Sequence, residues 1–374
     1  MSIYFDYAST TKIRKEVYEA MLPYLESEFG NPSSLYDIGI SNKKLINQCR
    51  KKIANLIYAK ANEIYFCSGG SEANNWALKG IAFKNKIGKE IITTKIEHHS
   101  ILHSCQFLEN LGYTVHYLAV DNEGFVNLKA LERLINTNTI LVSIMMANNE
   151  IGTIQNIKDI GLLCKKHNVI FHTDAIQGIS HIPINVEAMN IDLMSISGHK
   201  FYAPKGIGCL YIRNGVEIEN LIHGGAQEKN KRAGTENIAY IVGMTKGLEI
   251  VTHEMATCII QERELAQYLY DKLKAKVSNW RLNGPAIGKN RLPGNLNLSF
   301  KDCDGALLNY NLNKVGICVS TGSACNSNMI EASHVLQAIK VPDAYINGTI
   351  RITLGRETTK ADIDKLVAAI TSLI

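Results

Sequence analysis

The chain has 374 residues, of which 46% are hydrophobic, so it can bury a sizeable core, and its length suggests two or three domain-sized units. Lysine and arginine number 40 against 35 aspartates and glutamates, and the excess is scattered instead of forming the basic blocks of nucleic-acid or membrane arms. The first residues lack a basic segment followed by an apolar run, and no stretch approaches the roughly 18 apolar residues of a membrane span. We therefore expect a soluble, cytoplasmic protein that binds neither nucleic acid nor membrane.

Short apolar runs rich in isoleucine and valine alternate with longer helical patterns between about residues 60 and 212, which predicts an α/β fold with a mostly parallel sheet. The predicted strands are 63–67, 90–94, 114–118, 139–146, 169–172, 192–195 and 208–212, and the helical patterns between them include 71–84, 100–110 and 157–167. A proline-free amphipathic stretch from 237 to about 276 then predicts one or two connecting helices. Predicted strands at 295–300 and 316–320 and a closing helix at 360–374 indicate a second, smaller unit.

The nine cysteines include no CxxC pair and do not form the even framework of small secreted domains, so we expect most of them to be reduced. Cys67, Cys209 and Cys318 lie in apolar, strand-like runs and are predicted to be small buried hydrophobes. Cys325 differs, because it lies in a small polar segment, 320–327, that predicts an accessible loop. Accessibility is what a reacting thiol needs.

The first strand of the predicted sheet is followed by Ser68-Gly69-Gly70-Ser71 and then by the start of a helix. A helix N-terminus that glycine opens to close approach is a natural phosphate site. An ordinary helix cap, with Ser71 as the capping residue, explains the segment as well. It therefore indicates a ligand site only if other segments converge on it.

Polar residues also follow the later strands, and ligands of open parallel sheets bind at the carboxyl ends of strands. Pyridoxal phosphate requires a lysine for a Schiff base, an acid for the pyridinium nitrogen, a flat group against the ring and donors for the phosphate. A lysine in such a position would by itself be an exposed surface residue, and a histidine would be a buried core residue. Together, the polar clusters supply every part of the cofactor site. The clusters are Glu97-His98-His99, Asn148-Asn149-Glu150, Asp174 with Gln177, and Ser197-Gly198-His199-Lys200.

A series of motifs extends along essentially the whole chain: YFDYASTT at 4–11, FGNPSS at 29–34, NNEIG at 148–152, HTDA at 172–175, SGHK at 197–200, RAGTEN at 232–237, the Cys325 segment, and residues 350–356. In this order they resemble the motifs of NifS/IscS-like cysteine desulfurases, in the class V aminotransferase group of pyridoxal-phosphate enzymes. The resemblance implies the type I fold of pyridoxal-phosphate-dependent transferases. Its large domain, with a mostly parallel seven-stranded sheet, would be residues 14–258, and its smaller α+β domain residues 1–13 and 259–374.

The resemblance also implies roles for single residues. Lys200 would form the Schiff base with the cofactor, Asp174 would pair with the pyridinium nitrogen, and Gln177 would contact the ring hydroxyl. His98 would stack on the ring and help to move protons. Asn149 would steer the ring and the substrate carboxylate.

The remaining implied roles concern the phosphate and the substrate. The phosphate contacts would be Gly70, Ser71, Ser197 and His199. Thr235 would reach the phosphate of the neighbouring subunit, so a homodimer is the expected active unit. Arg351 would clamp the substrate carboxylate, for which a planar guanidinium fork is well suited.

The implied reaction takes sulfur from free L-cysteine. The substrate replaces Lys200 on the cofactor, and the freed Lys200 amine removes the alpha proton. The Cys325 thiolate attacks the substrate sulfur, which leaves alanine and a persulfide on Cys325 for a sulfur acceptor or iron-sulfur scaffold protein. This transfer predicts a mobile loop over residues 321–331. Transient ligation of an iron-sulfur cluster by Cys325, together with a scaffold, stays open.

Two alternatives remain. An aminotransferase or a selenocysteine lyase of the same fold would share Lys200 and Asp174. An aminotransferase has no use for the Cys325 thiol, whereas the residues alone do not separate cysteine from selenocysteine. A non-catalytic sulfur or iron-sulfur scaffold would use histidines and cysteines as metal ligands, but the sequence has no close-paired ligand motif beyond His98-His99.

Overall fold

The computed structural model describes residues 2–321 and 333–374. The largest sheet among these residues has seven strands in the order β2-β8-β7-β6-β5-β3-β4, and only β8 runs opposite to the other six. The predicted mostly parallel sheet is confirmed. The strands are β2 (Ile64–Cys67), β3 (Glu90–Thr94), β4 (Thr114–Leu118), β5 (Thr139–Ser143), β6 (Ile170–Asp174), β7 (Leu193–Ser197) and β8 (Gly208–Ile212).

Helices cover both faces of this sheet, which explains why its strands are almost continuously apolar. Neighbouring side chains along a strand point to opposite faces. Ile91 and Leu141 therefore belong to one core cluster, and the next residues, Ile92 and Val142, belong to the other. The first face packs against α3 (Gly70–Lys84) and α4 (His99–Glu109), and the second against α2 (Asp37–Leu56) and α6 (Ile157–Lys166).

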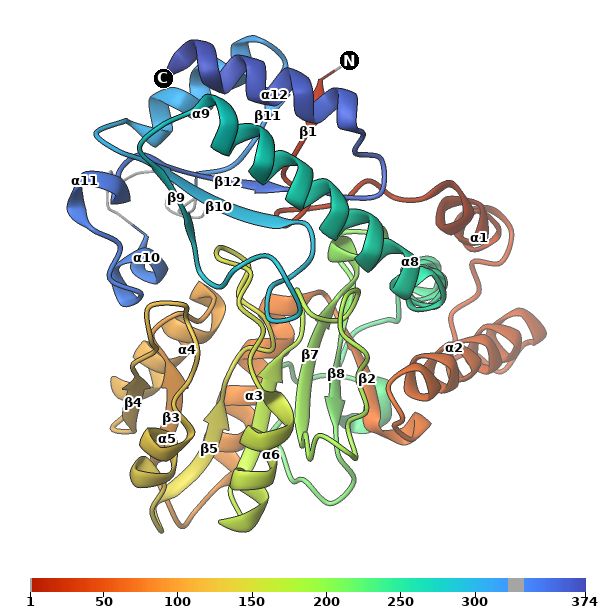
Figure 1. Ribbon diagram of the computed structural model, residues 1–374. Helices are drawn as coiled ribbons and strands as arrows, with labels where there is room; N and C mark the ends of the chain where they lie inside the picture. The colour runs from red at the N-terminus through yellow and green to blue at the C-terminus, as the bar shows by residue number, and fades with distance from the viewer. Residues whose placement is uncertain (1, 322–332) are drawn as a thin grey trace.

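A second body lies above the carboxyl ends of the parallel strands (Figure 1). Its sheet consists of β10 (Asn295–Phe300) between β9 (Trp280–Asn283) and β12 (Thr349–Thr353), all antiparallel. A separate apolar core joins this sheet to α9 (Gly305–Lys314), α12 (Lys360–Leu373) and the end of α8 (Ile238–Lys276). The predicted domain boundary at residue 258 falls inside α8 and stays a prediction.

The remaining elements are short or peripheral. Strand β9 and the helices before residue 60 were not predicted, and the stretch from 237 to 276 forms one helix of 39 residues. No helix of the described residues is long and apolar enough to cross a membrane. The other elements are β1 (Ile3–Tyr4), β11 (Ile317–Cys318), α1 (Lys15–Glu26), α5 (Leu128–Leu134), α7 (Gln227–Asn230), α10 (His334–Ala338), α11 (Asp343–Ile346) and the 3₁₀ turns η1 (Ala61–Glu63) and η2 (Gly198–Lys200).

The eight cysteines in the described part of the chain carry free thiols. Cys67 and Cys209 are buried, as predicted, whereas Cys318 is only half-buried at the end of β11. Cys325 and most of the predicted mobile loop lie outside the described residues.

The N-terminal segment joins the two bodies. Strand β1 pairs with β11, and Asp6 forms a bridge to Thr353 in β12. A few residues later the Thr11 amide donates to the His199 carbonyl oxygen at 3.0 Å, directly beside η2. The segment therefore passes from the second body to the edge of the large sheet, where the predicted site residues lie.

A buried ion pair fixes the turn that precedes the long helix. Arg50 in α2 binds Glu228 in α7 through two hydrogen bonds of 2.6 and 2.8 Å, and the same carboxylate accepts the Phe66 amide at 2.9 Å. The two side chains are only 6% and 3% exposed. Glu228 has a left-handed φ of 46°, so the pair and the amide together stabilise a turn that a non-glycine residue rarely adopts.

Arg50→Ala is expected to lower the free energy of unfolding by about 3–5 kcal/mol, because it leaves the Glu228 carboxylate buried without its cation. Urea unfolding measures the change. The control is Lys52→Ala, two residues after Arg50 in α2, which breaks an exposed ion pair with Glu249. It should lower the free energy of unfolding by at most about 1 kcal/mol. Equal losses in the two variants would contradict this interpretation.

Candidate active site

A cavity of about 420 Å³ lies where the carboxyl ends of the parallel strands face the second body. Residues from the sheet edge, from the N-terminal segment and from β12 line it, so both bodies form the site. Thr235 is exposed and does not line the cavity, and Cys325 lies outside the described residues. The predicted site residues that the cavity brings together are Gly70, Ser71, His98, Asn149, Asp174, Gln177, Ser197, His199, Lys200 and Arg351.

Lys200 ends the 3₁₀ turn that follows β7, which places its amine at the sheet edge. Its Nζ donates to the carbonyl oxygens of Ala8 at 2.6 Å and Ser9 at 2.9 Å. The Gln177 side-chain amide donates to the same Ala8 oxygen at 2.8 Å. The N-terminal segment thus forms one wall of the site and orients two of the predicted residues.

Asp174 ends β6 and is 5% exposed. One carboxylate oxygen accepts from the Asn74 side-chain amide at 2.7 Å, and the other accepts from the Ile176 amide at 2.9 Å. These two donors hold the carboxylate in one orientation at the cavity wall. Asn74 was not predicted as a site residue, although it lies one turn after Gly70 in α3, on the same helix face.

His98 is the N-cap of α4, and its Nδ1 accepts hydrogen bonds from the amide of Ser100 at 3.1 Å and its hydroxyl at 2.8 Å. Because Nδ1 accepts, the proton of the neutral ring is on Nε2. Burial lowers the pKa of His98, and the Lys200 charge acts in the same direction, while Asp174 opposes both. His98 is therefore a neutral ring near both charged groups.

The start of α3, where a phosphate site is predicted, is not closed by a capping side chain. The N-cap is Gly69, with φ of 154° and no side-chain cap, so the expectation that Ser71 could be the capping residue is wrong. A Cβ on Gly70 would lie 2.2 Å from the end of the Ile176 side chain, so a larger residue would fit there only if Ile176 moved. Burial, assisted by the Lys200 charge, lowers the pKa of His199 to about 4, so this lining residue is also neutral.

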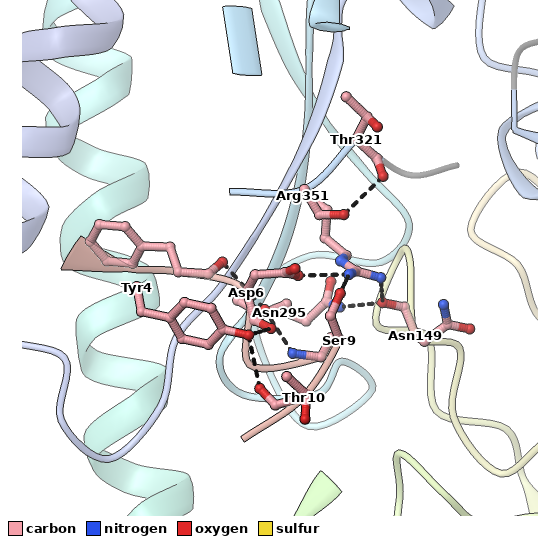
Figure 2. A network of polar contacts seen from close by, with 12 residues as sticks. Tyr4, Asp6, Ser9, Thr10, Asn149, Asn295, Thr321 and Arg351 are labelled. Carbon is pink, nitrogen blue, oxygen red and sulfur yellow. Dashed lines mark hydrogen bonds and ion pairs between the residues drawn. The ribbon is translucent and has the colours of Figure 1, made fainter. Parts of the chain in front are cut away.

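Arg351 extends from the second body into the cavity and is 4% exposed (Figure 2). Its Nη2 donates to the Asp6 carboxylate and to the Ser9 hydroxyl, both at 2.8 Å. Its Nη1 donates to the Asn149 carbonyl oxygen at 3.2 Å, and Asn295 donates to that same oxygen at 3.1 Å. The guanidinium therefore joins the N-terminal segment, the loop after β5 and β12 at one point.

Two carboxyl groups on the cavity wall hold their protons more tightly than an ordinary glutamate does. Burial raises the pKa of Glu97 to about 8 and that of Glu150 to about 7. Glu97 accepts from Thr94 and from the Met145 amide, and Glu150 accepts from the Ser333 hydroxyl at 2.5 Å. The sequence placed both residues at strand ends but indicated no shift, because the shift depends on burial.

Glu97→Gln is expected to make the free energy of unfolding less dependent on pH. The folded pKa of Glu97 is raised to about 8 from its usual 4.5, so its stabilising contribution is complete below pH 4.5 and is lost as the pH rises through 8. One proton corresponds to a slope of at most about 1.4 kcal/mol per pH unit in this window. Glutamine is neutral at every pH and keeps the accepting oxygen.

Urea unfolding at about pH 5.5 and about pH 8 measures this difference. The free energy of the parent protein should fall more between the two pH values than that of Glu97→Gln. Glu19→Gln, a change at an exposed carboxylate, serves as the control and should behave like the parent. A variant with the same pH dependence as the parent would show that Glu97 is ionised in the folded state.

Known proteins are similar to this chain along nearly its whole length. The chain is 51% identical over 363 residues to cysteine desulfurase IscS of Dictyoglomus turgidum, which covers 97% of this chain and 92% of the relative. It is 50% identical to cysteine desulfurase IscS of Clostridium botulinum, with 100% of this chain and 94% of the relative covered.

Solved structures share the fold. A NifS-like protein has a TM-score of 0.94 at 37% identity and covers 100% of this chain and 99% of its own. SspA in complex with cysteine has a TM-score of 0.83 at 37% identity and covers 96% and 100%. The expected type I fold of pyridoxal-phosphate-dependent transferases is thereby confirmed. The aminotransferase class-V family matches residues 3–366, and the chain belongs to that family.

Proposed function

We propose that this chain is a pyridoxal-phosphate-dependent cysteine desulfurase that forms L-alanine from L-cysteine and carries the sulfur as a persulfide on Cys325. The observation that supports this most strongly is the position of Arg351. It enters, from the second body, the same cavity that Lys200, Asp174 and His98 line. A lysine amine, a buried acid, a neutral ring and a carboxylate-binding cation are the groups that amino-acid chemistry on this cofactor needs.

The residues of the cavity fit pyridoxal phosphate. When bound, the cofactor supplies an electron sink that makes bonds at the alpha carbon of an amino acid labile. Lys200 would hold it through the amine, and the oriented Asp174 carboxylate would hold the ring nitrogen. The start of α3, at Gly70 and Ser71, offers backbone amides to the phosphate, because no side chain caps that helix.

The chain's own residues then perform the reaction. Arg351 binds the carboxylate of cysteine, and the Lys200 amine, once the substrate amine has replaced it, removes the alpha proton. His98 carries its proton on Nε2, so it can donate a hydrogen bond without being charged. The Cys325 thiolate attacks the substrate sulfur; the carbon–sulfur bond breaks and a sulfur–sulfur bond forms. The β-carbon then takes up a proton, and the α-carbon takes back the one that Lys200 removed. Alanine leaves, and the persulfide remains on the protein.

Two further parts of the proposal concern partners. A homodimer is proposed, in which Thr235 of one subunit reaches the phosphate site of the other. The exposure of Thr235 outside its own cavity supports this. The persulfide is proposed to pass to an acceptor protein, such as an iron-sulfur scaffold or a thiolation enzyme. Within residues 2–321 and 333–374, no group of three histidine, cysteine, aspartate or glutamate side chains is arranged to hold a metal ion.

The purified protein is expected to be yellow and to release sulfide and alanine in equal amounts from L-cysteine and a reducing thiol. Lys200→Ala should lose the Schiff-base absorbance and the activity. Cys325→Ala should keep the absorbance and lose sulfide release by at least about 100-fold, because the attacking nucleophile is removed.

Cys303→Ala is the matched control, since Cys303 is a half-buried thiol that does not line the cavity. It should retain both colour and activity. A colourless protein without sulfide release would refute the proposed function. Full activity in Cys325→Ala would instead favour a lyase that releases sulfide directly.

A further inference from the structure

The hydrogen bonds of Arg351 leave no adjacent pair of its donors available to a ligand. A guanidinium binds a carboxylate best through two neighbouring N–H groups, either Nε with Nη2 or Nη1 with Nη2. Both pairs include Nη2, whose two hydrogens go to Asp6 and Ser9. The Nε–H is buried and has no acceptor within residues 2–321 and 333–374. A ligand carboxylate can therefore bind through two hydrogen bonds only if Nη2 releases one of these residues.

Asp6 is held in place independently of this contact. Its carbonyl oxygen accepts the Tyr4 hydroxyl at 2.9 Å and the Ser9 amide at 3.0 Å, and the residue bridges to Thr353. The backbone of Arg351 is held by reciprocal hydrogen bonds with Ser320. The ion pair, drawn in Figure 2, thus joins two segments whose backbones are each held by other hydrogen bonds.

The charge of Asp6 acts on Arg351 with little screening. The two side chains are 18% and 4% exposed, and their nitrogen–oxygen distance is 2.8 Å. Charges at this distance interact far more strongly in a partly buried site than in water. Among the described residues that accept a hydrogen bond from Arg351, only Asp6 carries a charge, because Ser9 and the Asn149 carbonyl are neutral.

We propose that Asp6 is a built-in competitor for the substrate carboxylate. It neutralises Arg351 when the site is empty and yields part of the guanidinium when an amino acid enters. Asp6 is thus a positioning residue that acts through Arg351 and weakens the binding of any α-carboxylate. Cysteine and alanine share that group, so strong binding to it would retain the product without accelerating the reaction. The inference rests on the proposed function and deepens its account of substrate binding.

Asp6→Asn removes the charge and keeps an accepting oxygen. In the holoenzyme, titration of the cofactor absorbance with L-alanine should show about tenfold tighter binding. Ethylamine, which is alanine without its carboxylate, should bind within about twofold of the parent value. The KM for cysteine should fall by a similar factor, with no rise in kcat. A general loosening of the site would weaken both ligands and would not tighten one of them.

Changes at Ser9 test the same competition at the other acceptor of Nη2. Ser9→Asp adds a second carboxylate and should weaken alanine binding by about tenfold, again without changing ethylamine. Ser9→Ala removes a hydrogen bond but no charge and should change alanine binding by less than about threefold. The Ser9 series decides the question even if Asp6→Asn does not fold.

The outcomes separate this inference from the proposed function. If alanine does not perturb the parent holoenzyme, or if Arg351→Lys binds alanine as well as the parent does, the proposed carboxylate clamp is wrong. If the parent binds alanine through Arg351 but Asp6→Asn does not tighten binding, or tightens ethylamine equally, Asp6 is not a competitor.

Discussion

The parallel direction of four neighbouring strands is the constraint on which the site depends. Because β3, β5, β6 and β7 run the same way, the residues that follow them reach the same edge of the sheet. His98, Asn149, Asp174 and Lys200 are spread over about one hundred positions of sequence but line one cavity. Helices stabilise this arrangement because they cover both faces of the sheet. The apolar side chains that alternate between the two faces are therefore buried.

The sheet alone, however, supplies only half of the chemistry. The groups proposed to hold the cofactor come from the sheet edge, whereas Arg351, proposed to bind the substrate carboxylate, comes from β12 in the second body. The N-terminal segment connects the two, because the carbonyls of Ala8 and Ser9 orient Lys200 while Asp6 and the Ser9 hydroxyl bind Arg351. The same short segment, residues 6–9, thus binds a positively charged group from each body: Lys200 from the large sheet and Arg351 from β12.

The strand periodicity and the polar clusters predicted the sheet and most of the cavity wall, because both depend on residues that are near one another in sequence. Asn74, Asp6 and the titration shifts of Glu97 and Glu150 could not be predicted from the residues alone. The contacts of Asn74 and Asp6 join residues that are far apart in sequence, and the pKa shifts depend on burial. A local sequence pattern shows neither distant contacts nor burial. The role of Cys325 still rests on resemblance, since the segment lies outside the described residues.

The long separation between Asp6 and Arg351 has a consequence for how the protein is made. Their contact spans 345 positions. Asp6 therefore leaves the ribosome long before Arg351, the residue that it binds. A nascent chain of about 300 residues already contains Lys200 and Asp174 but lacks Arg351. Sheet folding can precede this closure, whereas contacts of such high sequence separation form late. The part of the site proposed to bind the substrate carboxylate is therefore completed after the part proposed to hold the cofactor.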